Sequence, residues 1–333
     1  MAGPVAAGGV TFAVAGPADE ADIRRLLRDN PLGGRYGLSL EREPDAFAGH
    51  AGTYILARYH GEAIGLCERV VHPVFVDGQE RRLPYLGALR VAPSHRHRLP
   101  VLRGGFAALR GLERPDELPF ALTAITADNS PARRLLTAGL PGLPLYRPLT
   151  DYATLALRPR RGHVAADIAA ADATDLPELA AFLHRVNAGH PFAPVWKEKD
   201  LRNLGAEHLL ISRGAAGIRG CLAVWDQRAV RQVVVRRYPP LLGRLRPLVN
   251  LAAPLFGLPR LPAPGEAIRQ AILSAVAVEK DDPAVLLALV AAALDQAARR
   301  GLEAVLFGCA AAHPWREVLR RRYRALEYRT TLF

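Results

Sequence analysis

Cysteine is scarce in this sequence of 333 residues, and its scarcity excludes several kinds of protein. The three cysteines, Cys67, Cys221 and Cys309, lie far apart, and none belongs to a C-x-x-C pair. A disulfide scaffold and a zinc site on paired cysteines are therefore excluded, and we expect reduced, mostly buried thiols in a cytoplasmic protein. The histidines are dispersed apart from two on one turn, so no metal site is expected.

The sequence also lacks long apolar runs and the common nucleophile and phosphate motifs. Its longest apolar run, AVLLALVAAAL at 284–294, is shorter than the roughly 20 residues that cross a bilayer. We interpret this run as a buried helix, not a transmembrane segment. The first residues carry no charged region typical of a signal peptide. Neither G-x-S-x-G nor a P-loop occurs, so hydrolase and P-loop chemistry are not expected.

Acidic and aromatic residues are few compared with basic ones. The formal net charge is +12, the sequence pI is about 10.2, and all but three of the 44 basic residues are arginine. This charge suits an anionic partner: nucleic acid, a membrane surface or a phosphate-bearing cofactor. Aromatic residues make up 7% and do not alternate with basic ones, so nucleic acid is not expected. Half of the residues are hydrophobic, enough for a folded core and two domains.

The chain reaches a similar ending twice. YRPLTDYATLAL at 146–157 and YRALEYRTTLF at 323–333 share Y-R-x-L, one or two polar residues, and Y-x-T. Four further segments of the first half match segments of the second in the same order. They are PADEADIRRLL with AADATDLPELAAFL, EAIGLCERVV with GIRGCLAVW, LGALRVAPS with LSAVAVEKD, and FALTAITADNSPARRLL with AVLFGCAAAHPWREVL. This ordered set predicts two tandem copies, at 1–157 and 158–333.

Periodicity and turn residues predict the same mixed α/β order of elements in each copy. A short strand leads into a helix capped by Asp. Antiparallel strands follow, in the first copy at 53–61, 63–78 and 84–92. A polar turn, a helix, a fifth strand, a short helix near Pro131 or Pro314 and two final strands complete each copy.

The second copy carries an insert at 230–265 that is rich in Arg, Leu and Pro. We expect it to project from the second copy and to brace the two copies by covering apolar surface at their junction. A cap over a site and contact with a membrane surface are the alternatives. Its middle, 241–257, predicts an amphipathic helix broken at Pro247 and Pro254. A basic segment with Pro and Gly at 157–164 predicts the linker.

The order of elements resembles that of the GNAT-type N-acetyltransferase superfamily, and three segments carry the resemblance. LGALRVAPSHRHR at 86–98 is similar to the family's fourth strand and turn, L-x-V-x-P-x-x-R-G-x-G-x-G. ITADNSPARRLL at 125–136 is similar to its fifth strand and the helix N-x-x-A-x-x-L-Y, and AVAGPADEADIRRLL at 13–27 to its opening strand and helix. The resemblance covers 11–157 and extends more faintly to 164–333. It implies two tandem GNAT-like acyl-CoA N-acyltransferase domains of the α/β class, with mixed sheets.

The resemblance also implies an acetyl-CoA, or another acyl-CoA, between the fourth and fifth strands. Its pyrophosphate would lie on the N-terminus of the next helix. Arg96 falls on the family's arginine, but the glycine positions hold His97, Leu99 and Val101. We expect arginines to hold the phosphates instead, and a solvated surface turn is the alternative. The expected cofactor-binding residues are Leu89, Val91, Arg96, Arg98, Arg103, Gly104 and Asn129, the last of which is also a possible helix cap.

The equivalent turn of the second copy is acidic. It reads Glu279, Lys280, Asp281 and Asp282, without a glycine, and its aspartates would repel phosphate. Asp282 is typical of a helix N-cap. We therefore predict a degenerate C-terminal copy that does not bind coenzyme A.

Acyl transfer to an amine needs a base for the ammonium group and an acid for the leaving thiolate. The predicted fourth strand holds no acidic residue, so Glu68 on the neighbouring strand is the candidate base; a solvent-facing glutamate is the alternative. Leu136 occupies the family's tyrosine position, which makes Tyr146 the candidate acid. Tyr323 repeats Tyr146 in the second copy, which favours a packing role for both.

Three functions are compatible with this sequence. The first is an acyl-CoA-dependent N-acyltransferase that acts on an unidentified small-molecule or peptide amine. The second is a catalytically inactive GNAT-like protein that binds a ligand or partner, which the missing glycines and tyrosine favour. The third, a nucleic-acid-binding protein, is prompted by the charge of +12.

Overall fold

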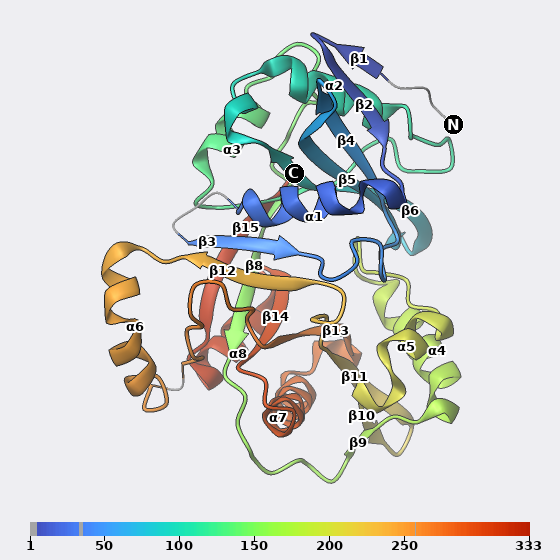
Figure 1. Ribbon diagram of the computed structural model, residues 1–333. Helices are drawn as coiled ribbons and strands as arrows, with labels where there is room; N and C mark the ends of the chain where they lie inside the picture. The colour runs from blue at the N-terminus through green and yellow to red at the C-terminus, as the bar shows by residue number, and fades with distance from the viewer. Residues whose placement is uncertain (1–4, 33–35, 257) are drawn as a thin grey trace.

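A computed structural model describes residues 5–32, 36–256 and 258–333, and it shows two halves that each contain a sheet covered by helices (Figure 1). The first sheet has the order β1-β2-β4-β5-β6. Its strands are β1 (Val5–Ala7), β2 (Val10–Val14), β4 (Thr53–Tyr59), β5 (Glu62–Val76) and β6 (Gln79–Val91). The three antiparallel strands predicted from the sequence are thereby confirmed as β4, β5 and β6.

Two helices cover the two faces of this first sheet. Side chains alternate between the faces of a strand, so Leu66 of β5 packs with α1 (Glu20–Asp29) while its neighbour Cys67 packs with α2 (Leu99–Arg110). Burial on both faces explains why β4 and β5 read as nearly continuous apolar runs. It also means that adjacent residues of β5 serve different sides of the sheet, which matters for Glu68.

The second sheet has eight strands in the order β7-β15-β8-β14-β13-β11-β10-β9. They are β7 (Ala124–Thr126), β8 (Thr150–Leu157), β9 (Ile168–Ala170), β10 (Leu209–Gly214), β11 (Gly217–Trp225), β13 (Gln270–Val278), β14 (Ala304–Ala310) and β15 (Leu326–Leu332). The helices packed on it are α4 (Leu176–Asn187) and α5 (Glu198–Leu204) on one face, and α7 (Pro283–Arg299) and α8 (Pro314–Tyr323) on the other. The run AVLLALVAAAL lies in α7, a buried helix as predicted.

Short 3-10 helices precede or follow several of these elements. They are η1 (Pro17–Asp19), η2 (Pro93–His95), η3 (Ala173–Asp175), η4 (Ala206–His208) and η5 (Glu279–Asp281). The predicted linker after β8 has no helix or strand and runs along α7, where Gly162 N donates to Asp295 Oδ1.

The two similar segments, at 146–157 and 323–333, contain the neighbouring strands β8 and β15 of the second sheet. β8 and β15 pair antiparallel, with Tyr152 opposite Thr330, Ala153 opposite Arg329, and Thr154 opposite Tyr328. The two Y-x-T segments therefore face each other in a symmetric register. Figure 1 shows this pair, green and red, running between the two halves.

The prediction of two final strands in each half is wrong. Each half contributes one strand, β8 or β15, after its short helix. β15 from the end of the chain separates β7 from β8, and β8 separates β15 from β14. The final strands are thus exchanged: β8 of the first half pairs with β14 of the second, and β15 of the second half pairs with β7 of the first. Local sequence patterns do not reveal this long-range exchange.

The 230–265 insert divides into a bracing strand and a projecting helix. β12 (Gln232–Arg237) pairs with β3 (Gly37–Glu41) of the first half in a two-stranded sheet. This pairing braces the halves by backbone hydrogen bonds.

The projecting helix of the insert is α6 (Pro240–Ala252), at the left of Figure 1. It exposes leucines instead of covering the junction, contrary to the prediction. The helix also continues through Pro247 and ends before Pro254, so only the second predicted break is confirmed.

Candidate functional site

A β-bulge occurs at the same place in each half. In the β5–β6 ladder Leu66 pairs with Arg90 and Glu68 with Gly87, so two residues of β6 face one residue of β5. Ala88 in this bulge has a φ of 48°, the left-handed region that a residue with a Cβ rarely adopts. Such a bulge leaves ladder groups unpaired and turns the strand away from its neighbour.

The bulge of the second half lies on β13, opposite β11. Cys221 pairs with Ala277 and Ala223 with Ser274, and Ala275 has the same φ of 48°. The repeat alignment matches LGALRVAPS with LSAVAVEKD, and it therefore places Ala88 over Ala275. The shared strain at aligned positions is a structural counterpart of the sequence repeat.

Beyond each bulge, the bulged strand separates from the strand that follows it in the repeat. In the first half, Leu86 N donates to Leu122 O at 2.8 Å, and past this point β7 pairs with β15. Among the described residues, no backbone hydrogen bond joins the end of β6 to β7. In the second half, the pairing of β13 with β14 ends at Ile272–Leu306. We call the two openings the first and second wedge.

The second wedge is closed by a tryptophan. Trp315 follows Pro314 at the start of α8, is 8% exposed, and packs with Phe307 of β14. Its indole Nε1 donates to Asp281 O at 3.0 Å, in the turn after β13. The side chain thus connects the two sides of the opening. In the first half the residue after Pro131 is Ala132, whose methyl side chain packs against the core and is too short to span the opening.

The turns that follow the two bulged strands also differ in charge. The second turn has a hollow of about 230 Å³, lined by Arg219, Glu279, Lys280, Asp282 and Val285. Its charges are balanced, and Arg219 pairs with Asp282 at 3.2 Å. Asp282 caps α7 by accepting from Ala284 N, as predicted. The charged residues of the turn after β6, Arg96 and Arg98, are both basic.

The three predicted phosphate-binding arginines point to three different protein partners. Arg96 donates from Nε to Val91 O, Arg98 lies over the ring of Tyr59 at 5.1 Å, and Arg103 donates to Pro141 O. All three are exposed at the N-terminal end of α2. They surround a helix start with free N–H groups, but they do not converge on one point.

The remaining predicted cofactor residues have separate settings. Leu89 and Val91 follow the bulge on β6, and Leu89 is exposed. Gly104 lies where α2 crosses β2, and a Cβ there would come 2.1 Å from the ring of Phe12, so the close helix–sheet contact requires glycine. Asn129 caps α3 (Ser130–Thr137) by accepting from Ala132 N at 3.4 Å. Asn129 has the capping role that was the alternative to ligand binding.

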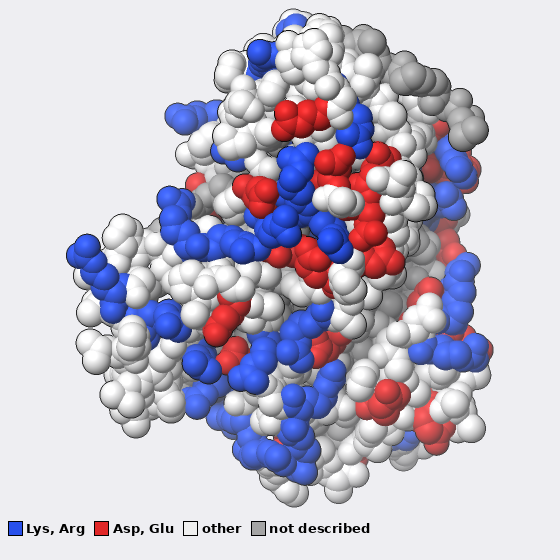
Figure 2. Space-filling view, in the orientation of Figure 1, with Lys and Arg blue, Asp and Glu red and all other residues white. Residues whose placement is uncertain are grey.

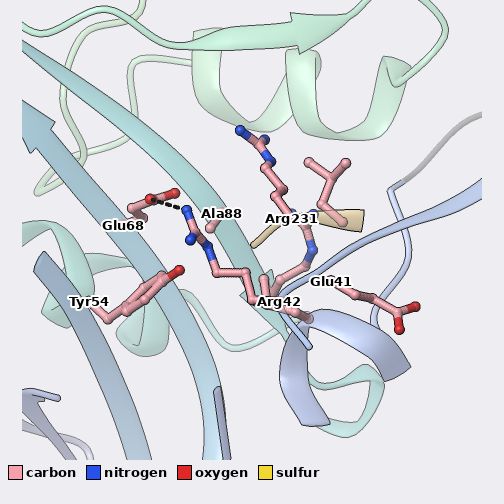
Figure 3. A pocket seen from close by; sticks show the side chains of 9 residues that line it. Glu41, Arg42, Tyr54, Glu68, Ala88 and Arg231 are labelled. Atoms are coloured by element: carbon pink, nitrogen blue, oxygen red, sulfur yellow. Dashed lines mark ion pairs between the residues drawn. The ribbon is translucent and has the colours of Figure 1, made fainter. Parts of the chain in front are cut away.

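Glu68 lies in a small cavity on the α1 side of the first sheet, beside the bulge. The cavity, about 30 Å³, has room for a water molecule or a small polar group. It is lined by Leu27, Leu40, Glu41, Arg42, Tyr54, Glu68, Ala88, Arg90 and Arg231. Figure 3 shows Arg42 directed towards Glu68, Tyr54 below them, and Arg231 entering from the other half of the chain. We call it the Glu68 cavity.

The environment of Glu68 is unusual for a carboxylate. Burial raises its pKa, while Arg42, Arg231 and Arg90 act in the opposite direction. Arg42 lies 3.9 Å from the carboxylate and His50 Nδ1 lies 3.3 Å from it. Gly87 lets the carboxylate approach the bulge, because a Cβ there would lie 3.3 Å from Glu68 Oε2. Glu68 is therefore not the solvent-facing glutamate that was the alternative.

His50 is a neutral neighbour of this carboxylate. Its side chain is 2% exposed and stacks on Tyr54 with ring centroids 4.2 Å apart. Burial, together with Arg42 and Arg231, lowers the pKa of His50 to about 4. At neutral pH the ring is uncharged, and it orients Glu68 without neutralising it.

Tyr146 lies on the opposite side of the first sheet from Glu68. Its ring packs between Phe106 of α2 and Phe333, with centroids 6.2 and 6.0 Å away. Burial and the nearby Cys67 raise the pKa of Tyr146, so the phenol stays protonated at neutral pH. Because Cys67 and Glu68 are adjacent on β5, the two candidate catalytic groups flank the same segment of the sheet.

Sequence reasoning missed most of the cavity around Glu68. His50 lies in a loop without a motif, Arg42 follows the short strand β3, and Arg231 belongs to the insert of the other half. Arg90 belongs to the quoted segment LGALRVAPS, but nothing marks it as buried. Its charge inside the otherwise uncharged segment 84–92 was the available signal. Among the described residues no group of three His, Cys, Asp or Glu could hold a metal ion.

Comparison with solved structures identifies the architecture. Structures of Saccharomyces cerevisiae N-myristoyltransferase with bound myristoyl-CoA match 99% of this chain and 81% of theirs, at 10% identity and a TM-score of 0.63. The fold is that of the acyl-CoA N-acyltransferases. A GCN5-related glucosamine N-acetyltransferase region of a fungal multi-domain β-N-acetylglucosaminidase matches 99% of this chain and 38% of its own, at 16% identity and a TM-score of 0.61.

A further solved structure agrees with this architecture. A GCN5-related N-acetyltransferase from Kribbella flavida matches 97% of this chain and 70% of its own, at 12% identity and a TM-score of 0.50. No protein-family model and no curated protein matches the sequence. The predicted mixed α/β fold of the GNAT type is confirmed. Across the part of the chain that the structure describes, no helix is long and apolar enough to cross a membrane.

Proposed function

We propose that this protein transfers an acyl group from an acyl-CoA thioester, such as acetyl-CoA, to the amine of a small molecule or peptide. The observation that supports this proposal most directly is the first wedge. There the bulged strand separates from its neighbour beside a buried carboxylate, in an acyl-CoA N-acyltransferase fold. The thioester occupies the wedge, and the amine approaches from the Glu68 cavity. The protein acts in the cytoplasm, which its three free, buried cysteines support.

Glu68 and Tyr146 supply the two proton transfers. The Glu68 carboxylate takes a proton from the ammonium group, and the freed amine attacks the thioester carbon. A C–N bond forms, the C–S bond breaks, and the departing thiolate takes the phenolic proton of Tyr146. The nitrogen loses its second proton to solvent, from which the Tyr146 phenolate is reprotonated. Burial raises the pKa of Glu68, which makes its carboxylate a stronger base, and it keeps the phenol of Tyr146 protonated at neutral pH.

The first turn binds the pyrophosphate through Arg96, Arg98 and Arg103, with backbone donors from the start of α2. Leu89 and Val91 of β6, Gly104 of α2 and Asn129 at the start of α3 complete the proposed cofactor contacts. Because the arginines point apart, binding requires their side chains to turn towards the ligand, which long exposed side chains do readily.

The two halves are proposed to be a tandem duplication whose C-terminal copy is degenerate. The aligned bulges, the symmetric β8–β15 register and the ordered sequence matches support a duplication. Trp315 across the second wedge and the charge-balanced turn beside it, whose Asp282 is paired with Arg219, support loss of ligand binding there. The domains are 1–157 and 158–333, with the exchanged final strands between them.

An assay of free thiol release tests the proposed function. The full chain is incubated with acetyl-CoA, and separately with longer acyl esters, in the presence of a pooled set of amines. We expect amine-dependent thiol release that Glu68→Gln reduces. Protection from thermal unfolding by coenzyme A without any thiol release would favour the inactive ligand-binding protein instead.

A further inference from the structure

Arg90 is a buried guanidinium with open donors. The residue is 8% exposed, and its Nη1 donates to the carbonyl of Leu89. Its Nε and Nη2 are buried and have no hydrogen-bond partner among the described residues. These two nitrogens form one edge of the guanidinium plane, the edge that binds both oxygens of a carboxylate. A buried donor pair without a partner is costly, so it calls for a ligand group.

The charged side chains around Arg90 do not pair with its open guanidinium edge. Arg42 and Arg231 line the same cavity, against the single carboxylate of Glu68, which pairs with Arg42 at 3.9 Å. Glu41 also lines the cavity, but its carboxylate binds Ser39 and Arg236. Three guanidiniums thus face one available carboxylate. The excess of positive charge favours an anionic group in the cavity.

The position of this anion relative to the proposed base follows from the bulge. Arg90 pairs with Leu66 and Gly87 pairs with Glu68, and Ala88 between them lines the cavity. An amine next to Glu68 would therefore have its own anionic substituent within a few bonds. Small amino acids have this arrangement.

We propose that the acceptor carries a carboxylate beside its amine and that Arg90, with Arg42 and Arg231 of the cavity lining, binds this carboxylate. The inference rests on the proposed function for the identity of the acceptor. It adds the substrate class: amino acids or short peptides with a free carboxylate near the amine, not plain amines. Arg90 is a specificity-determining residue in this account, and Glu68 remains the base.

Four small probes test the proposal on the full chain: glycine, methylamine, acetate and inorganic phosphate. We expect acetate and glycine to raise the unfolding temperature and methylamine not to do so, because it lacks the carboxylate. Calorimetric titration should give at least tenfold tighter binding of glycine than of methylamine. Equal binding of the two amines, or no effect of any anion, would overturn the proposal. A stronger effect of phosphate than of acetate would overturn the carboxylate proposal and indicate a phosphorylated acceptor.

Arg90→Met gives the sharpest variant, and Arg81→Met is its matched control. Arg81 lies on the same strand but is exposed. Arg90→Met should weaken the binding of glycine and of acetate at least tenfold. The unfolding temperature of this variant without ligand should stay equal or rise, because a buried unpaired charge has been removed. Arg81→Met should change neither. A marked fall in unfolding temperature for Arg90→Met alone, with anion binding retained, would make Arg90 a structural residue.

Titration of the wild-type protein with coenzyme A separates this proposal from the proposed function. Anion binding without coenzyme A binding at millimolar concentration would contradict the acyltransferase and leave the carboxylate site standing. Coenzyme A binding together with acylation of plain amines, at rates equal to those of amino acids, would contradict only the carboxylate site.

A second, independent observation concerns the outer face of α6. Leu241, Leu245, Leu248 and Leu251 are 41–78% exposed, and Leu255 and Phe256 just beyond the helix are 83% and 58% exposed. The opposite face is fixed: Asn250 exchanges two hydrogen bonds with Leu261, and Arg246 donates to the same carbonyl. The helix is thus held firmly while it presents a leucine-rich face, on which Arg244 is also exposed.

The positive charge around α6 favours an anionic partner for this face. The segment 238–261, which contains α6, has three arginines, Arg244, Arg246 and Arg260, and no acidic residue. Figure 2 shows the projecting lobe as a white surface with blue side chains. We propose that α6 lies on an anionic membrane surface, with its leucines among the lipids and its arginines on the headgroups. A second copy of this chain would bring equal positive charges together and is the less favoured occupant.

Vesicle flotation tests this second proposal with the full chain. Vesicles of phosphatidylcholine and phosphatidylglycerol should bind the protein at least tenfold better than pure phosphatidylcholine, and 0.5 M salt should weaken the binding. A double variant, Leu248→Ser with Leu251→Ser, should lose it. The control is Leu326→Ser, whose leucine is exposed on β15. Binding that the double variant retains, or a dimer in sedimentation velocity that it abolishes, would overturn the membrane proposal.

Discussion

The two wedges of this protein have the same backbone geometry and differ in the side chains that lie in them. Both have a bulge with an alanine at a φ of 48°, and both open where the bulged strand leaves its neighbour. In the second, Trp315 reaches from α8 to the turn after β13. In the first, Ala132 leaves the corresponding space and Glu68 faces a charged cavity. The fold is therefore kept by backbone geometry, while a few side chains decide which wedge remains usable.

The largest expected effect comes from making the first wedge like the second. Ala132→Trp should abolish measurable coenzyme A binding, because the indole occupies the space that the ligand needs. Arg134→Trp, on the exposed side of α3, is the control and should bind as the wild type does. Isothermal titration with circular dichroism of both variants checks the result. Normal binding by Ala132→Trp would place the ligand outside the first wedge.

The next largest effect is catalytic. Glu68→Gln should lower the rate constant for acyl transfer by about 10²–10⁴-fold, the usual contribution of a general base. Because burial raises the Glu68 pKa, the wild-type rate should rise with pH through a value above the ~4.3 of an ordinary glutamate. The base acts ionised, so activity is lost on the acidic side. A variant whose rate and pH profile match the wild type would remove Glu68 from the mechanism.

A third change tests the second wedge alone. Trp315→Ala should destabilise the fold by about 3–5 kcal/mol, because it empties a buried site and frees the Asp281 carbonyl. Coenzyme A binding at 15 °C should be unaffected. Denaturant unfolding measures the change in stability, and calorimetric titration measures the affinity for coenzyme A. A destabilisation below about 1 kcal/mol would show that Trp315 does not hold the wedge closed.

The smallest effect separates the two turns. Arg98→Ala should weaken coenzyme A about tenfold, since a charge-assisted contact contributes about 1.5–3 kcal/mol. Asp281→Ala, at the corresponding turn of the second half, should leave the affinity unchanged. The same titration gives both values. An equal effect of the two substitutions would mean that neither turn is specific for the pyrophosphate.

Much of the fold followed from local patterns, but its centre did not. The antiparallel strands β4, β5 and β6 and the buried helix α7 could be predicted, because apolar alternation in strands and capping residues at helix ends are local features of a sequence. The exchange of β8 and β15 could not, because either final strand is compatible with either half. The helix through Pro247 was also missed: α6 tolerates the proline in its exposed region.

The candidate site was predicted less completely than the fold. Glu68 and Tyr146 came from the family resemblance, and their opposite positions across the first sheet are new. Arg42, Arg90, Arg231 and His50 were not predicted, because they meet only in three dimensions. Arg231 in particular approaches Glu68 only because β12 pairs with β3.

The number of coenzyme A molecules bound per chain tests the central claim most directly. Calorimetric titration of the wild-type protein, with native mass spectrometry as a check, measures it without any substitution. An open first wedge and a closed second wedge predict one molecule per chain. Two molecules per chain, or none at millimolar coenzyme A, would contradict the account.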